Sequence, residues 1–118
     1  MQKDFAAFHA KLGVKLQAYA PIASSAWTLK SEELKNLVLF EEPVIKSIAA
    51  KYGKSPAQIV LNWHIYSRGH IIIPKTSKVE RLSENLHVYE FKLTEEEYAS
   101  ISGLDRNSRF FNPLHISL

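Results

Sequence analysis

The run from Ile71 to Asn85, with the sequence IIIPKTSKVERLSEN, constrains the fold more than any other part of the chain. Its first three residues, Ile71 to Ile73, form an unbroken apolar stretch, as expected for a parallel β-strand that is buried on both faces. Pro74 has no N–H to donate to a neighbouring strand, so it ends this one. Because parallel strands occur mainly in sheets that are covered by helices, the run predicts an α/β fold.

The residues that follow the strand favour the binding of an anion. Ser77 is predicted to cap the next helix, and Glu80, one turn later, completes a capping box. The free N–H groups of that first turn would lie beside the ammonium group of Lys75, where anions collect. Arg81 follows on the helix, and its planar guanidinium can bind a phosphate through two hydrogen bonds. A phosphate site is therefore predicted at the carboxyl end of the strand, where parallel α/β proteins bind their ligands.

Two further polar residues extend this pattern along the helix. Glu84 and Asn85 lie one turn beyond Arg81, on nearly the same helix face. Each of them taken alone would be a solvated surface residue. Together, a carboxylate and an amide can read the exocyclic amine and ring nitrogens of adenine. The whole arrangement suits an adenine dinucleotide that carries an extra phosphate.

A second strand and several helices are predicted around this run. The predicted elements are a helix over 2–12, a strand over 14–20 that ends at Pro21, an irregular segment over 22–40, a helix that begins at 41–43 and stops at Gly53, a helix from 55 to near Gly69, the strand over 71–73, and helices over about 78–86 and 94–102. This order gives two parallel strands joined by a helical crossover. Two strands cannot close a barrel, so each would expose an unpaired edge and apolar faces meant for neighbouring elements.

The composition excludes several classes of function. The chain has 118 residues, is 46% hydrophobic and 23% charged, and carries a net charge of +3, as an ordinary globular domain does. It has no cysteine, and its histidines show no metal-ligand spacing, so no metal site is predicted. Basic residues are scattered among acidic ones, which argues against nucleic acid as a partner. No apolar run approaches the roughly 20 residues of a membrane span, and a cytoplasmic protein is expected.

Several motifs resemble one enzyme family. The run IPKTSxxxRxxEN closely resembles the signature that aldo-keto reductases carry after the last strand of their (β/α)8 barrel, and LQAYAPIASSAW resembles the end of their seventh strand. LFEEPVIKSIAAKYGKSPAQIVLNW and LHVYEFKLTEEEYASISGLDRN are similar to their C-terminal helices. The resemblance runs from about Gln2 to Asn112. It implies an α/β fold that is the C-terminal part of a (β/α)8 TIM barrel, with two parallel strands and about five helices, incomplete as an isolated chain.

The resemblance also implies NADP as the cofactor and gives roles to individual residues. Lys75 and Arg81 match residues that bind the 2′-phosphate, and Tyr19 matches a tyrosine that stacks on the nicotinamide. Ala20 stands where the family often has a serine that contacts the pyrophosphate, so that hydrogen bond is absent here. The residues implied in cofactor binding are Tyr19, Ile22, Ser24, Lys75, Thr76, Ser77, Arg81, Glu84 and Asn85. Trp27 matches a loop that shapes the substrate pocket.

The catalytic groups of the family have no match in this chain. Family members are roughly twice to three times its length, and their catalytic tyrosine, lysine, histidine and aspartate come from the first strands of the barrel. Residues 1–118 are therefore expected to form a partial oxidoreductase domain, inactive when isolated. In the complete enzyme, the resemblance implies NADP(H) and a small aldehyde or ketone as partners, with an N-terminal half or another protein completing the barrel.

Two interpretations from other classes remain open. The first is a non-catalytic, truncated reductase that serves as a structural or assembly component of a larger complex, docking its open strand edges on another subunit. The second is a lone nucleotide-binding module. The mass of the native polypeptide would separate an enzyme fragment from a truncated product.

Overall fold

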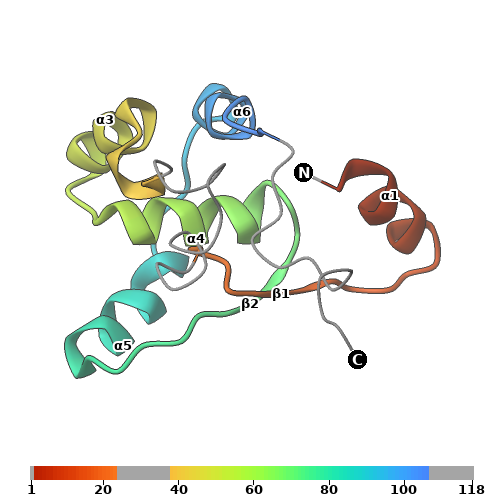
Figure 1. Ribbon diagram of the computed structural model, residues 1–118, viewed down its shortest axis with the longest axis horizontal. Coiled ribbons are helices and arrows are strands. Elements are labelled where there is room, and N and C mark those ends of the chain that lie inside the picture. The colour runs from red at the N-terminus through yellow and green to blue at the C-terminus, as the bar shows by residue number, and fades with distance from the viewer. Residues whose placement is uncertain (1, 24–37, 107–118) are drawn as a thin grey trace, which may run out of the picture.

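The computed structural model of the protein describes residues 2–23 and 38–106 (Figure 1). Its elements are α1 (Lys3–Lys11), β1 (Gln17–Tyr19), the 3₁₀ helix η1 (Leu39–Glu41), α3 (Pro43–Tyr52), α4 (Pro56–Tyr66), β2 (Ile71–Ile73), α5 (Val79–Leu86), the 3₁₀ helix η2 (His87–Tyr89) and α6 (Glu95–Ser102). None of these helices is long and apolar enough to cross a membrane.

The two strands form a parallel sheet, which confirms the predicted α/β arrangement. Gln17 pairs with Ile71, and Tyr19 pairs with Ile73. The helices α3 and α4 connect the strands, as the crossover of a parallel pair requires. Because the strands run in the same direction, their carboxyl ends meet at one edge of the sheet.

The strands are less covered than buried parallel strands, and the predicted bounds of the first strand are wrong. Ile71 and Ile73 have the apolar sequence of a strand that is covered on both faces, but they are 53% and 45% exposed, as expected of two strands without barrel neighbours. The described sheet has only two strands, so further strands and helices do not cover these side chains. The first strand is also shorter than the range 14–20. The N–H of Val14 donates to the carbonyl of His9 at the end of α1, and Ala20 leaves the strand with a φ of 46°.

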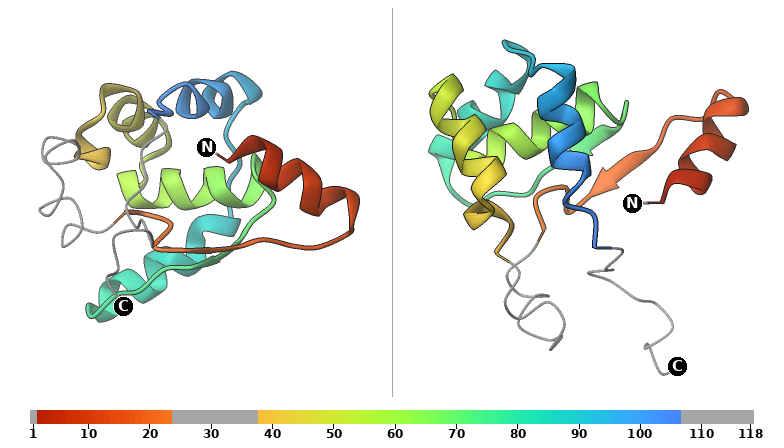
Figure 2. Two further views of the ribbon diagram at one scale, coloured as in Figure 1. Left: turned by 45° about the vertical axis from the view of Figure 1, so that its right-hand side comes forward. Right: turned by 90° about the horizontal axis from the view of Figure 1, so that it is seen from above.

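The hydrophobic core forms around α4. In Figures 1 and 2 this helix lies between α3 and α6 on one side and the strands and α5 on the other. It is buried at Ile59, Val60 and Leu61, as its apolar sequence predicts. The buried apolar residues of the described chain are Ile45, Ile48, Ala49, Ile59, Val60, Leu61, Val88, Leu93, Tyr98 and Ile101.

A buried polar network joins α4 to the segments that follow α5. The Asn62 side chain is fully buried, and its Nδ2 donates to the carbonyls of Val88 and Phe91, each at 2.8 Å. Its Oδ1 accepts from the Tyr98 hydroxyl at 2.8 Å, and that hydroxyl in turn accepts from the N–H of Leu93 at 3.1 Å. Every polar atom of the amide is thus engaged without water, which fixes η2 and α6 against α4.

Local capping signals set the ends of the core helices. Gly53 ends α3 in the left-handed conformation, with a φ of 60°, as its position predicts. Ser55 begins α4 through a capping box with Gln58. The predicted capping box of α6 is confirmed, because the Thr94 hydroxyl accepts from the N–H of Glu97 and the Glu97 carboxylate accepts from the N–H of Thr94.

The first helix stands apart from this core. Figure 2 shows α1 separated from α3, α4 and α6, and none of its residues is buried. Phe5, Phe8 and Leu12, which predicted the amphipathic helix, are 50%, 60% and 62% exposed. The helix therefore forms as predicted, but no other described element covers its apolar face.

Candidate functional site

The candidate site begins where the two strands end together. Tyr19 is the last residue of β1 and lies opposite Ile73, the last residue of β2. Lys75 follows Ile73 after one proline, and both Tyr19 and Lys75 are exposed. The structure therefore brings the predicted nicotinamide-stacking tyrosine and the predicted phosphate-binding lysine to the same edge of the sheet. This is the edge at which parallel α/β proteins bind ligands.

The link from β2 to α5 differs from the prediction. The cap of α5 is Lys78 and not Ser77, and no side chain caps the helix, so the predicted capping box of Ser77 with Glu80 is wrong. The Thr76 hydroxyl instead accepts from the N–H of Lys78 at 3.1 Å, a local turn that moves the helix start to Val79. Within the described chain, the first N–H groups of α5 therefore have no side-chain acceptor, close in sequence to the Lys75 ammonium.

The polar residues of α5 lie as the sequence predicts. Arg81 and Glu84 are exposed, and Asn85 is half-buried. Glu84 and Asn85 lie one helical turn beyond Arg81. The Gln58 side chain on α4 donates to the carbonyl of Glu84 at 2.9 Å and so fixes the helix in place. The structure thus presents this polar face of α5 on a rigid support.

The charges around the site are uncompensated. Among the described residues, neither Lys75 nor Arg81 has a carboxylate partner, whereas other cations do. Lysine and arginine ion pairs elsewhere in the described chain are Lys46 with Glu41, Lys51 with Glu97 at 2.6 Å, and Arg106 with Glu42 at 2.5 Å. An exposed lysine and arginine that form no ion pair among the described residues can each contact a phosphate.

A tight turn follows Tyr19 on the other strand. The N–H of Ala23 donates to the carbonyl of Ala20 at 3.0 Å, which closes the turn over Pro21 and Ile22. Pro21 is buried, and Ile22 packs against the core. Ala20 and Ala23 have φ values of 46° and 60°. The predicted site residues Ser24 and Trp27 lie outside the described residues.

A histidine that the sequence analysis did not assign to the site holds this turn. The Nε2 of His64 lies 2.9 Å from the Pro21 carbonyl, and its Nδ1 lies 3.2 Å from the Nδ1 of His70. Burial, followed by the neighbouring His70 and Arg68, lowers the pKa of His64 to about 4. Burial and Arg68 also lower the pKa of His70. The signal in the sequence is a histidine within the apolar helix 56–66.

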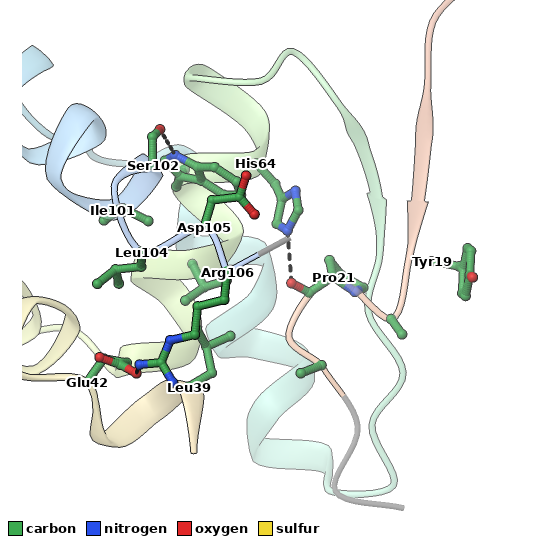
Figure 3. A pocket seen from close by; sticks show the side chains of 14 residues that line it. Tyr19, Pro21, Leu39, Glu42, His64, Ile101, Ser102, Leu104, Asp105 and Arg106 are labelled. Carbon is green, nitrogen blue, oxygen red and sulfur yellow. Dashed lines mark hydrogen bonds and ion pairs between the residues drawn. The ribbon is translucent and has the colours of Figure 1, made fainter. Parts of the chain in front are cut away.

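An apolar cavity of about 280 Å³ lies behind the turn (Figure 3). Pro21, Leu39 and Leu104 line it, together with Trp63, which is half-buried and donates to the Ser102 hydroxyl at 2.9 Å. In Figure 3 the Tyr19 ring points away from the other labelled side chains of the cavity. Tyr19, Ala20 and Ala23 also belong to the lining, so the turn after β1 forms one wall of the cavity. No group of three or more potential metal ligands occurs among the described residues.

Comparison with known proteins places the chain in a family. It matches the model of the Aldo/keto reductase family over residues 1–106. It is 40% identical over 115 residues to Aldo-keto reductase family 1 member A1 of Gallus gallus, covering 96% of this chain and 34% of that protein. It is 43% identical over 103 residues to the NAD(P)H-dependent D-xylose reductase of Scheffersomyces stipitis, covering 86% of this chain and 32% of that protein.

A solved structure agrees with these sequence matches. The aldo/keto reductase from Brucella melitensis superposes with a TM-score of 0.72 and 33% identity, over 89% of this chain and 35% of that one. The chain belongs to the aldo-keto reductase family, and its fold is the corresponding part of a (β/α)8 barrel. It spans about a third of the length of the relatives that it matches.

Proposed function

We propose that this chain forms the C-terminal, NADP-binding segment of an aldo-keto reductase that reduces aldehydes or ketones to alcohols. The observation that carries the proposal is the register of the sheet, which places Tyr19 beside Ile73 and so brings Tyr19 and Lys75 to one edge. The name of the xylose reductase relative describes it as NAD(P)H-dependent, which supports a nicotinamide cofactor.

The choice of NADP over NAD rests on the positive charge at this edge. Lys75 supplies a point charge and Arg81 a planar fork for the 2′-phosphate. The Ser77 hydroxyl is a further donor, because it takes no part in capping α5. Thr76 would contact the phosphate beside it after releasing the bond from its hydroxyl to the Lys78 carbonyl. NAD has no 2′-phosphate, so it would leave these two cations without an acidic partner.

The remaining predicted residues would contact the other parts of the cofactor. Glu84 and Asn85 hold the adenine, Ile22 and Ser24 line the pyrophosphate, and Tyr19 stacks on the nicotinamide. Trp27 forms a wall of the substrate pocket. When bound, the cofactor supplies a hydride to the carbonyl carbon of the substrate. In this proposal the chain binds and orients the cofactor, and the proton donor comes from the rest of the barrel.

The rest of the barrel would cover apolar surface that is exposed here. Ile71 and Ile73 on β2 are about half exposed, and Val79 and Leu86 on α5 are 78% and 72% exposed. Such a surface on a sheet of two strands favours further strands of the barrel as its partner. An N-terminal portion of a reductase fits this surface, whether it belongs to the same polypeptide or to another one.

The binding of cofactor fragments to the isolated chain tests the proposal. The chain should bind adenosine 2′,5′-bisphosphate, as measured by isothermal titration calorimetry, and should bind adenosine 5′-monophosphate about tenfold or more weakly, because the latter lacks the 2′-phosphate. Raised salt should reduce the difference, since it screens the exposed cations. Equal affinity for the two nucleotides would contradict the proposed 2′-phosphate site.

A further inference from the structure

The turn after Tyr19 adopts a backbone conformation that needs support. Ala20 and Ala23 have φ values of 46° and 60°, in the left-handed region that favours glycine. An alanine at such an angle is maintained only when surrounding contacts hold it there. The hydrogen bond from Ala23 to Ala20 closes the turn but does not anchor it to the rest of the protein.

Pro21 and Ile22 hold the turn by apolar packing, and among the described residues the side chain that bonds to its backbone comes from α4. The carbonyl of Pro21, at the centre of the turn, accepts a hydrogen bond from the Nε2 of His64 at 2.9 Å, as Figure 3 shows. Pro21 itself has no N–H to donate. Because α4 lies at the centre of the core, this bond connects the strained turn to a helix that is held by buried contacts.

The partners of His64 determine which of its nitrogens carries the proton. A carbonyl oxygen can only accept, so the Nε2 of His64 must be protonated. The imidazole is neutral at pH 7, so its Nδ1 is an acceptor and the Nδ1 of His70 must donate to it. His70 thus holds His64 in the tautomer that can donate to Pro21.

The backbone fixes His70 in that role. Its N–H donates to the carbonyl of His64 at 3.0 Å, and the N–H of Gly69 donates to the carbonyl of Ile65 at 3.1 Å. His70 immediately precedes β2, whose register sets the position of Tyr19. The same pair of histidines therefore connects the end of β1, the helix α4 and the start of β2. Arg68 is the charged group that acts on both imidazoles.

We propose that His64, oriented by His70, is a positioning residue for the turn of residues 20–23 and, through it, for the nicotinamide end of the cofactor site. The cofactor part of this inference rests on the proposed function. The role concerns the part of the cofactor that NADPH and NADH share. It therefore differs from that of Arg81, whose effect is confined to the 2′-phosphate.

Two substitutions separate hydrogen bonding from packing. His64→Leu keeps an apolar side chain of similar volume but cannot donate to Pro21. In His64→Gln the amide nitrogen can donate to Pro21, and the amide oxygen can accept from His70. His9→Leu is the matched control, because His9 also contacts a carbonyl, that of Phe5 at 2.8 Å, on the separate helix α1.

Nuclear magnetic resonance of the 118-residue chain tests the anchor without any cofactor. Nitrogen-15 spectra of the histidines should show the Nε2–H tautomer for His64 and the Nδ1–H tautomer for His70. Amide couplings that depend on φ should show Ala20 and Ala23 in the left-handed region. This signature should be lost in His64→Leu and retained in His64→Gln and His9→Leu. An unchanged turn in a folded His64→Leu protein, or the opposite tautomers, would overturn the inference.

Cofactor titration tests the second half of the inference. In His64→Leu the dissociation constants of NADPH and NADH should rise by the same factor, roughly fivefold to tenfold, the scale of one hydrogen bond. His64→Gln should stay within about twofold of the wild type. Unchanged affinity in His64→Leu would overturn the positioning role. Failure of the wild type to bind either cofactor would overturn the proposed function and this half of the inference, while the spectra would still decide whether His64 holds the turn.

Discussion

Tyr19 and Ile73 lie opposite each other as the last residues of two parallel strands. This pairing determines where two segments with different proposed roles in cofactor binding begin. The turn of residues 20–23 leaves from Tyr19, and the link to α5 leaves from Ile73. A dinucleotide along this edge would contact aromatic surface at one end and the cations of the link and helix at the other.

The buried amide of Asn62 should be a large contributor to stability. Asn62→Leu would leave the Tyr98 hydroxyl and the carbonyls of Val88 and Phe91 without their partner. The free energy of unfolding should fall by about 2–4 kcal/mol, because several buried polar groups lose a hydrogen bond at once. Urea denaturation followed by circular dichroism measures this change.

Ser100→Ala provides the control for Asn62→Leu. The Ser100 hydroxyl also donates to a backbone carbonyl, that of Glu96 at 2.8 Å, but it is exposed on α6. Its removal should change the free energy of unfolding by no more than about 0.5 kcal/mol. A similar loss of unfolding free energy in the two variants would show that the buried network stabilises the protein no more than an exposed hydrogen bond does.

His64 should make stability depend on pH between about 4 and 6.5. The unfolded histidine takes up a proton below its ordinary pKa of 6.5, whereas folded His64 does so only near a pKa of about 4. The unfolded state therefore binds more protons in this window, and the free energy of unfolding falls as the pH is lowered through it. The loss attributable to His64 should reach at most roughly 3 kcal/mol at pH 4.

The variant His64→Gln isolates this contribution. Because glutamine does not titrate, the decrease in unfolding free energy from pH 6.5 to pH 4 should be smaller than in the wild type. Urea denaturation at several pH values in this range supplies the comparison, and His9→Gln controls for the loss of a histidine elsewhere. Parallel pH profiles for wild type and His64→Gln would mean that the pKa of His64 is not lowered by folding.

Much of the fold follows from signals that are local in the sequence. Pro43 and Gly53 delimit α3, and Thr94 with Glu97 begins α6, because each signal acts within one helical turn. The failed cap at Ser77 is also local, since Thr76 offers the backbone a competing hydrogen bond one residue earlier. Patterns of capping residues do not decide between two such neighbours.

Features that join distant segments could not be predicted in this way. His64 and Pro21 are 43 positions apart, and no pattern within α4 indicates which carbonyl the imidazole meets. The exposure of Ile71 and Ile73 follows from the prediction of only two strands, but the apolar run does not indicate which element would cover them. The position of Arg81, Glu84 and Asn85 on α5 was predictable because they belong to one continuous motif, and their role in binding stays a prediction.

The isolated chain should not reduce carbonyl compounds. With a panel of aldehydes, NADPH consumption by the purified chain should not exceed that of the buffer, because no side chain here is assigned as the proton donor. Addition of the N-terminal portion of a related reductase should restore turnover if it completes the barrel. Reproducible turnover by the chain alone would contradict this expectation. Binding without rescued turnover would favour a structural role.

If Lys75 and Arg81 hold the 2′-phosphate of NADP, as we propose, the variant Arg81→Met should lose affinity for NADPH alone. Methionine retains much of the side-chain length but removes a charged hydrogen-bond donor whose contacts are worth roughly 1.5–3 kcal/mol each. Lys46→Met is the matched control, because Lys46 is an exposed cation on α3 that pairs with Glu41, away from the site.

Dissociation constants for NADPH and NADH, measured by quenching of protein fluorescence, give the answer. We expect Arg81→Met to weaken NADPH binding by about tenfold or more and to leave NADH binding nearly unchanged, whereas Lys46→Met should leave the binding of both cofactors nearly unchanged. Raised salt should further reduce the remaining preference for NADPH by screening Lys75. An equal loss for NADPH and NADH would show that Arg81 supports the fold or the shared pyrophosphate, and would contradict the assignment of the 2′-phosphate site.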